Sequence, residues 1–458
     1  MSTYTSDTPD DRAAMLAAIG AKSIDDLFAD IPAGVRLQRE LDLPAGKAEF
    51  EVFDHLSELA DKNIHSDREI SFLGAGMYDH YVPALVDSII TRSEFLTPYT
   101  PYQPEVSQGG LQVMFEYQTA IAELTGLDVS NASVYEGPSA MAAAGYLAQL
   151  ENGRGRFVVS QAVNPQYRET LKTNAHGYGT QVVEVPATDG LTDPAALAET
   201  IDADTAAVFI QNPNFFGAIE DVQALVDAAK AHDALVVCVA DPLTLGVLAP
   251  PGDFGVDICV GEGQTLGNRL DFGGPSFGFF AATKKLIRRM PGRIAGETTD
   301  VDGRRGWVLT LQTREQHIRR EKATSNICTS QALNALAGVI YLSWLGRQGI
   351  VELGELMLKR TAYAREALGA VDGVEILFDA PVFREFAIKL DAPVRAVLDQ
   401  LALDGINGGY PIGLDYPEYE NTMLVAITEK RSKEQIDLFA KSLASAVAAS
   451  KTGVGAEA

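Results

Sequence analysis

The fold is decided by one apolar stretch and the acid that ends it, Leu235-Val236-Val237-Cys238-Val239-Ala240-Asp241. A continuous run of this kind is typical of a strand that is buried on both faces, as in a parallel sheet covered by helices. Six similar short runs occur between residues 130 and 282, at 132–135, 156–160, 181–185, 206–210, 256–260 and 277–282. Helix-like stretches such as 221–231 fill most of the gaps. The pattern predicts an α/β domain with a mostly parallel seven-stranded sheet covered by helices.

The chain outside this sheet predicts two further parts. Residues 1–65 are expected to form a helical arm, with helix starts at Thr8 and Ser23, helical spacing of apolar residues from 47 to 62, and too few apolar residues for a core of its own. Residues 66–330 form the large domain. Residues 331–458 are expected to form linking helices and a small C-terminal α+β domain. The patterns in this region predict long helices over 313–370, strands at 374–378, 384–390 and 422–427, a helix capped by Asp391, and a turn-rich loop at 405–413.

Composition and charge exclude several classes of function. The 458 residues are 46% hydrophobic and 22% charged, which is typical of a folded chain, and no apolar run is long enough to span a membrane. The net charge of −25 disfavours nucleic acid and anionic membranes as partners. No signal peptide is recognisable at the N-terminus, and three distant cysteines form neither a disulfide framework nor a zinc site. We therefore expect a cytoplasmic protein without a metal site.

A large and a small α/β domain in this order are the layout of pyridoxal phosphate (PLP) enzymes of the aminotransferase type, PLP-dependent transferase fold type I. That chemistry needs a lysine that holds the cofactor as an imine and an acid near its ring nitrogen. Asp241 follows the fifth strand, where the acid is expected. The lysine should follow within about 20 to 40 residues, but no lysine occurs between Lys230 and Lys284. Gln264 or Thr265 stands in its place, and neither side chain can form an imine.

Four segments resemble the glycine cleavage system P-protein family (glycine dehydrogenase, decarboxylating). They are Thr97-Pro98-Tyr99-Thr100-Pro101-Tyr102-Gln103-Pro104-Glu105-Val106-Ser107-Gln108-Gly109, residues 313–328, Gly273-Gly274-Pro275 and Met290-Pro291-Gly292-Arg293. The resemblance extends from about residue 10 to 448. The length of the chain and its missing lysine match the lysine-less subunit 1 of the two-subunit form.

The resemblance implies a shared enzyme. One cofactor site is built by this chain and a subunit 2, and two such pairs assemble as α2β2. Subunit 2 holds PLP on its lysine, glycine is decarboxylated there, and the aminomethyl group passes to the oxidised lipoyl arm of the H protein. This chain would line the shared cleft and would be inactive alone.

Two groups of residues are expected near that chemistry. The proline-punctuated segment 97–108 cannot be a regular helix, and its polar side chains suit recognition of glycine at the shared site: Tyr99, Thr100, Tyr102, Gln103, Glu105 and Gln108. We expect the two tyrosines to point toward the partner's cofactor, and Glu105 or Gln108 to fix the loop or the substrate ammonium; the alternative is a solvated turn. A vestigial cofactor site is expected at Asp241, Gln264 and Glu136, which opens a helix after the first strand.

Two other functions remain open on the residues alone. One is a stand-alone PLP-dependent aminotransferase or decarboxylase, against which the missing lysine argues directly. The other is a non-catalytic scaffold or regulatory binder with the same fold.

Overall fold

The computed structural model of the chain describes residues 6–271 and 273–451, which divide into two units at Ile64 and His65. The first unit contains α1 (Pro9–Ala18), the 3-10 helix η1 (Ile24–Phe28) and α2 (Glu49–Ala60). Thr8 and Ser23 cap the first two with their hydroxyls, as predicted. No residue from 6 to 64 is buried, and the apolar side chains of α2 are exposed. This agrees with the expectation that the segment has no core of its own.

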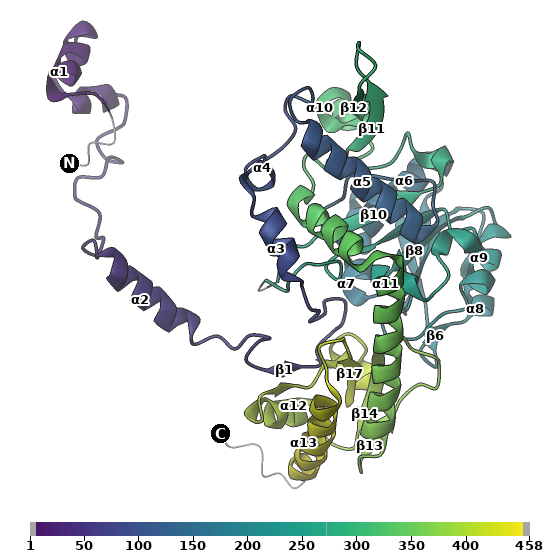
Figure 1. The fold of residues 1–458 in the computed structure, drawn as a ribbon. Coiled ribbons are helices and arrows are strands. Elements are labelled where there is room, and N and C mark those ends of the chain that lie inside the picture. The colour runs from purple at the N-terminus through teal and green to yellow at the C-terminus, as the bar shows by residue number, and fades with distance from the viewer. Residues whose placement is uncertain (1–5, 272, 452–458) are drawn as a thin grey trace. The chain divides into compact units, whose positions relative to one another are not determined.

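The second unit is built on a seven-stranded sheet in the order β2-β10-β9-β8-β7-β3-β4. Figure 1 labels β8 and β10 of this sheet. All its strands are parallel except β10, which is antiparallel to both neighbours. Six strands lie where the apolar runs predict them: β3 (Arg156–Ser160), β4 (Gln181–Val185), β7 (Thr205–Asn212), β8 (Leu235–Ala240), β9 (Ile258–Glu262) and β10 (Gly278–Ala282).

The first predicted strand is displaced. We expected residues 132–135, but β2 is Val129–Ser130, and Val134 makes only an isolated bridge with Gly278. The cause is Ser133, whose φ of +83° interrupts an extended strand.

Side chains that alternate along the strands build a core on each face of the sheet. In β8, Val237 and Val239 contact one core, while Val236 and Cys238 contact another. Helices α6 (Gly137–Asn152) and α7 (Pro165–Tyr178) cover the first face. The opposite face is covered by α8 (Pro194–Thr200), α9 (Val222–Lys230), α5 (Gln108–Thr125) and α11 (Ala332–Gly369). The chain therefore forms the layered α/β fold that the sequence predicts.

The segment between the sheet and α11 differs from the prediction. Long helices were expected from residue 313, but the structure has only η5 (Gln312–Arg314), α10 (Gln316–Arg319) and η6 (Arg320–Lys322) before α11. Extended backbone at Glu315 ends η5, and a φ of +53° at Arg320 ends α10. An unpredicted hairpin, β11 (Ile294–Thr299) with β12 (Arg305–Thr310), precedes them.

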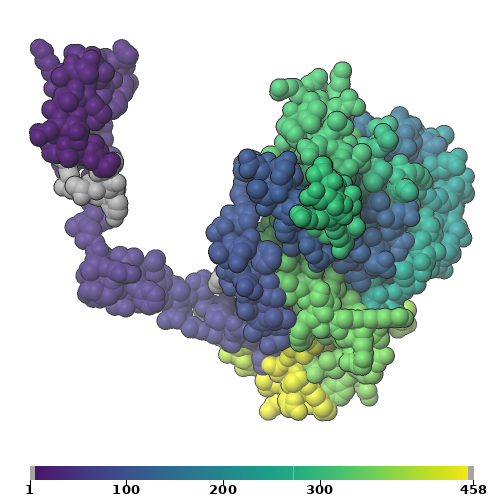
Figure 2. Space-filling model, turned by 45° about the horizontal axis from the view of Figure 1, so that its top comes forward, coloured from purple at the N-terminus to yellow at the C-terminus, as the bar shows by residue number. Residues whose placement is uncertain are grey.

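The C-terminal part contains a four-stranded antiparallel sheet, β13-β14-β17-β16, with helices α12 (Val394–Leu403) and α13 (Lys433–Lys451). Figure 2 shows α13, in yellow, at the surface. Its strands are β13 (Val374–Ile376), β14 (Glu385–Leu390), β16 (Tyr410–Pro411) and β17 (Thr422–Ala426), so the three predicted strands are confirmed. Two details were wrong. Pro393 stands at the N-cap of α12, because the Asp391 carboxylate pairs with Lys451 at 2.8 Å instead. The expected loop 405–413 holds two short strands, β15 (Ile406–Asn407) and β16.

Shorter elements complete the chain. β15 pairs in parallel with β1 (Ile70–Ser71), which ties the start of the second unit to the C-terminal part. The others are α3 (Ala84–Ile90), α4 (Ser93–Leu96), β5 (Ala187–Thr188), β6 (Leu191–Thr192), η2 (Pro242–Gly246), η3 (Pro251–Phe254), η4 (Lys284–Leu286), η7 (Ile412–Leu414) and η8 (Pro417–Tyr419). Among the helices of residues 6–271 and 273–451, none has the length and apolar character that crossing a membrane requires.

Candidate functional site

The cleft beyond the carboxyl ends of β7, β8 and β9 is where folds of this kind bind ligands. Asp241 follows β8 directly, and its carboxylate accepts the N–H of Leu243 at 3.2 Å. The same carboxylate forms an ion pair with Arg384, which is 2% exposed and precedes β14. The Arg384 guanidinium also lies 3.5 Å from the centre of the Tyr78 ring. The acid expected to face a cofactor ring therefore faces a cation of its own chain.

A buried carboxylate lies beside this pair. Glu385 accepts the hydroxyl of Tyr78 and the N–H of Ala75, the latter at 2.7 Å. Burial raises the pKa of Glu385 to about 7, although these two hydrogen bonds favour its ionised form. The cavity that Glu385, Tyr78 and Asp241 line has a volume of only about 40 Å³. This is room for a few water molecules at most.

The two candidates for the position of the missing lysine are both buried. The side-chain oxygen of Gln264 accepts the N–H of Tyr78 at 3.0 Å, and its amide nitrogen donates to the carbonyls of Tyr78 at 3.0 Å and Asn268 at 2.9 Å. Thr265 is 3% exposed, and no residue that the structure describes bonds its hydroxyl. Gln264 therefore ties the segment around Tyr78 to the loop that follows β9.

The start of α6 carries two carboxylates. Glu136 is the N-cap and accepts the N–H of Ser139 at 3.0 Å. Glu262, at the end of β9, accepts the N–H of Gly137 at 3.0 Å and the hydroxyl of Ser276 at 2.6 Å. Burial raises the pKa of Glu262. The N–H groups at a helix start after a strand commonly bind phosphate. Here two carboxylates of the chain accept N–H groups at that position.

The residues of this cleft do not fit PLP. The lysine is absent, Arg384 already neutralises Asp241, and Glu262 occupies the start of α6. A neighbouring cavity of about 340 Å³ is lined by both Glu136 and Glu262, and these carboxylates would repel a phosphate group. Side chains of this chain therefore occupy the cleft, and we call it the filled cleft.

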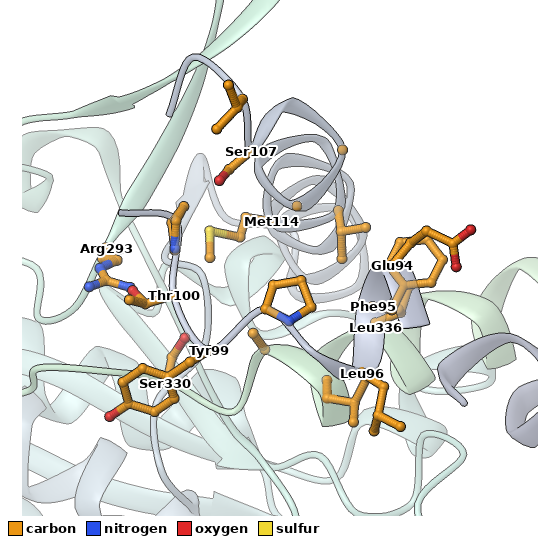
Figure 3. A pocket seen from close by; sticks show the side chains of 18 residues that line it. Glu94, Phe95, Leu96, Tyr99, Thr100, Ser107, Met114, Arg293, Ser330 and Leu336 are labelled. Atoms are coloured by element: carbon orange, nitrogen blue, oxygen red, sulfur yellow. The ribbon is translucent and has the colours of Figure 1, made fainter. Parts of the chain in front are cut away.

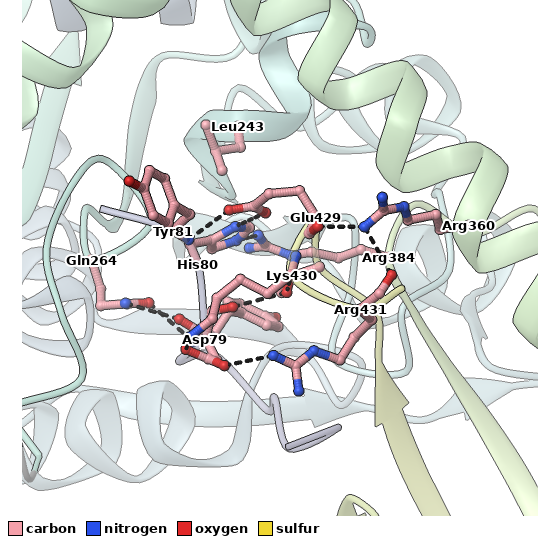
Figure 4. Close-up of polar contacts among 12 residues, drawn as sticks. Asp79, His80, Tyr81, Leu243, Gln264, Arg360, Arg384, Glu429, Lys430 and Arg431 are labelled. Carbon is pink, nitrogen blue, oxygen red and sulfur yellow. Dashed lines mark hydrogen bonds and ion pairs between the residues drawn. The ribbon is translucent and has the colours of Figure 1, made fainter. Parts of the chain in front are cut away.

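A charged network closes the cleft on the side of the C-terminal part (Figure 4). His80 lies 2.6 Å from Glu429, which also accepts the N–H of Tyr81 at 2.6 Å. Burial opposes ionisation of Glu429, but His80 and this N–H hold its pKa at about 2. Asp79 pairs with Lys430 at 2.7 Å and Arg431 at 2.9 Å. These contacts fix the segment 78–81 against residues 428–431.

The other predicted residues lie in the segment before α5. The rings of Tyr99 and Tyr102 are 72% and 80% exposed, and Gln103 and Glu105 are exposed as well. The Thr100 hydroxyl accepts a hydrogen bond from Arg293. Both tyrosine rings are therefore largely exposed in this chain. This exposure fits both a role in the shared site and a solvated turn.

Gln108 belongs to the scaffold of this segment. Its amide nitrogen donates to the carbonyls of Pro104 at 2.7 Å and Trp307 at 2.9 Å, and its oxygen accepts the N–H of Trp307 at 2.7 Å. Gln108 therefore joins the start of α5 to β12 and fixes the end of the loop, which is one of the two roles considered for it.

A cavity of about 460 Å³ lies between this loop, α5 and the start of α11, and we call it the loop cavity (Figure 3). Its wall is mostly apolar and includes Phe95, Leu96, Val113, Met114, Leu333 and Leu336. Tyr99, Thr100 and Arg293 supply polar groups on one side, and Glu94 lies on the opposite side. It is larger than the 40 Å³ cavity in the filled cleft, and its size suits a small organic ligand.

Within the described part of the chain, no three His, Cys, Asp or Glu side chains are placed to hold a metal ion. Cys238 and Cys259 are buried free thiols, as their apolar surroundings predict, and Cys328 is an exposed one.

Several residues of the site were not among the sequence candidates. Arg384 and Glu385 lie more than 300 positions from Tyr78 in the sequence, so no local pattern predicts that these residues are in contact. Arg293 lies inside a segment that the sequence analysis quotes, and Glu262 comes two residues after the predicted strand 256–260, so an acid near a strand end was the available signal for it.

The fold is that of PLP-dependent transferases of type I, and side chains of this chain occupy its cleft. A sphingosine-1-phosphate lyase of Burkholderia pseudomallei shares this fold alone, with a TM-score of 0.65 at 15% identity over 93% of this chain and 96% of that one. A crystal structure of glycine decarboxylase (P-protein) of the glycine cleavage system, in inhibitor-bound form, gives a TM-score of 0.89 at 44% identity, covering 97% of this chain and 100% of that chain.

Sequence comparisons agree with the second match. The family model for the glycine cleavage system P-protein matches residues 2–443. Two similar relatives come from Moorella thermoacetica and Bacillus subtilis, and both are named probable glycine dehydrogenase (decarboxylating) subunit 1. They are 52% and 50% identical over 95% and 96% of this chain, and 97% and 98% of their own lengths are covered. The chain belongs to the glycine cleavage system P-protein family, and the name of these relatives implies a second subunit.

Proposed function

We propose that this chain is the lysine-less subunit of a heteromeric glycine decarboxylase. In this proposal a subunit 2 carries PLP on its lysine, and two pairs of subunits assemble as α2β2 in the cytoplasm. The complex decarboxylates glycine and passes the aminomethyl group to the oxidised lipoyl arm of the H protein. The single observation that carries the proposal is the filled cleft, in which Arg384 neutralises Asp241 and Glu262 occupies the start of α6.

The same proposal gives the loop 97–108 a task. PLP on the partner would supply the electron sink for decarboxylation. Tyr99 and Tyr102, which this chain leaves exposed, would face the shared site together with Thr100, Gln103 and Glu105. Gln108 fixes the end of the loop through Trp307, and the apolar wall of the loop cavity would exclude water. Fixed geometry matters because small misplacements of reacting groups cost rate.

Glycine–bicarbonate exchange tests the proposal. Purified chain, purified subunit 2 and lipoylated H protein are assayed alone and together. We expect exchange only with all three present, and no imine absorbance from this chain alone after addition of PLP. Exchange by subunit 2 and H protein at the same rate without this chain would refute the catalytic role and favour the non-catalytic scaffold. An imine band on this chain alone would favour the stand-alone PLP enzyme.

A further inference from the structure

Arg293 is a cation of the loop cavity whose charge is unmatched. Its side chain is partly buried in the wall of the cavity, and its hydrogen-bond partner there is the neutral hydroxyl of Thr100 (Figure 3). Among the residues that the structure describes, no carboxylate lies within 4.0 Å of its guanidinium nitrogens. Glu94, the acid of this cavity, lies on the opposite side.

Three arginines that are more deeply buried than Arg293 have carboxylate partners. Arg168 pairs with Glu184 at 2.6 Å, Arg431 with Asp79 at 2.9 Å, and Arg384 with Asp241. Arg314 and Arg360, by contrast, donate to backbone carbonyls, and Arg293 donates to one neutral hydroxyl. A guanidinium held in a mostly apolar wall without a counter-charge is costly to keep. An anion from outside the chain would offset that cost.

The backbone around Arg293 is held in place independently of its side chain. Arg314 is 8% exposed, and its guanidinium donates to the carbonyls of Met290 and Gly292, the latter at 3.0 Å. Asn131 donates to the carbonyl of Pro291 at 3.0 Å. The turn 290–293 is therefore fixed by donors from two other segments, and the Arg293 side chain is free for a ligand. Arg314 acts here as a positioning residue.

We propose that Arg293, with the hydroxyl of Thr100, binds an oxyanion of a ligand in the loop cavity. Guanidinium presents several N–H donors in a fork that matches a carboxylate or a phosphate group. The Thr100 oxygen accepts from Arg293, so its own O–H is left to donate to the same anion. The inference rests on the proposed function, which brings two such anions to the shared site: the carboxylate of glycine and the phosphate of the partner's PLP.

Variants of the assembled complex test this assignment. Arg293→Met removes the charge and keeps much of the length, and Arg293→Lys restores a charge without the fork. Arg304→Met is the matched control, because Arg304 is 79% exposed on the β11–β12 hairpin and is not among the residues that line the cavity. Each complex with subunit 2 is checked by size-exclusion chromatography. PLP affinity is read by absorbance titration of the cofactor-free complex, and the KM and kcat for glycine are read by exchange.

We expect Arg293→Met to weaken binding of one anion by about ten- to a hundredfold, because a hydrogen bond to a charged group is lost. Arg293→Lys should recover part of this loss. A raised KM for glycine with unchanged PLP affinity assigns the carboxylate, and weaker PLP binding with an unchanged KM assigns the phosphate. Intact assembly with both quantities unchanged would overturn the inference. Failure of the proposed function shows separately, as an absence of exchange with the wild-type chain.

Discussion

The guanidinium of Arg384 forms an ion pair with the carboxylate of Asp241 inside the cleft at the end of β8. Arg384 comes from the start of the C-terminal part and Asp241 from the large sheet, so the pair also ties these two parts together. Within this chain, the charge of Asp241 is therefore matched by a structural contact. The consequences can be measured in the chain by itself.

Removing the cation of this pair should destabilise the fold. Arg384→Met leaves the Asp241 carboxylate in a closed site without its partner, and breaking a buried pair from one side costs about 3–5 kcal/mol. Arg289→Met breaks a pair with Glu151 in which both side chains are about 40% exposed, and should cost at most about 1 kcal/mol. Urea unfolding compares the two. Equal losses would contradict a structural role for the pair.

Glu385 should make stability depend on pH. Burial raises its pKa to about 7 from an ordinary value of 4.5, with Tyr78, Arg384 and Asp241 as its polar neighbours. The folded chain then binds more protons than the unfolded chain between these values, so the free energy of unfolding falls as pH rises through them. The contribution amounts to about 3 kcal/mol. The Gln side chain of Glu385→Gln cannot titrate. The free energy of unfolding of this variant, relative to that of the wild type, should therefore rise by up to this amount between pH ~4.5 and pH ~8. A difference that stays constant with pH would rule this out.

A glycine next to the same residue tests how closely the two parts approach. Gly217 has a φ of +85°, and a Cβ there would lie 2.0 Å from the carbonyl oxygen of Glu385. Gly303, in the β11–β12 hairpin, has a φ of +79° and open space around it. Gly303→Ala should cost about 1 kcal/mol for the left-handed backbone alone. Gly217→Ala should cost about 1–3 kcal/mol more because backbone atoms must move. Thermal unfolding of both variants would reveal equal costs if the approach were loose.

Tyr99→Phe and Tyr102→Phe separate the loop's role in activity from any role in folding. Both rings are more than 70% exposed, so each change should alter the free energy of unfolding by less than about 0.5 kcal/mol. Under the proposed function, each should lower glycine–bicarbonate exchange without weakening assembly with subunit 2. Tyr178→Phe, on α7, is the control. Unchanged exchange in both loop variants would remove the tyrosines from the shared site and favour the solvated turn.

The sequence could predict what depends on local pattern. The strand β8 is a continuous apolar run, so its place and the position of Asp241 at its end were predictable. The strand expected at 132–135 was misplaced because a φ of +83° at Ser133 interrupts an extended strand, and the apolar pattern does not show that angle. The hairpin β11–β12 has one local signal in the sequence, because Asp302-Gly303 is a common turn pair between strands.

The content of the cleft was harder to predict for a physical reason. Its missing lysine is a property of one position, which a sequence displays directly. The contacts that fill the cleft are made by residues distant in sequence: Tyr78 with Glu385, and Gly137 with Glu262. Neither residue of such a pair lies in an unusual local sequence. Likewise, Arg293 becomes informative only when the structure shows that no acid of residues 6–271 and 273–451 forms an ion pair with it.

Returning a lysine to the chain should not restore cofactor binding. Gln264→Lys would break three hydrogen bonds of Gln264 with the backbone of Tyr78 and Asn268 and bury an amine in their place. Arg384 would still neutralise Asp241, and Glu262 would still occupy the start of α6. We expect a less stable chain that forms no more phosphopyridoxyl adduct than the wild type when incubated with PLP and reduced with borohydride. Thr265→Lys tests the second candidate position, and mass spectrometry locates any adduct. A stoichiometric adduct at either position would mean that the cleft has kept room for the cofactor, and the proposal that catalysis depends on another polypeptide's lysine would lose its main support.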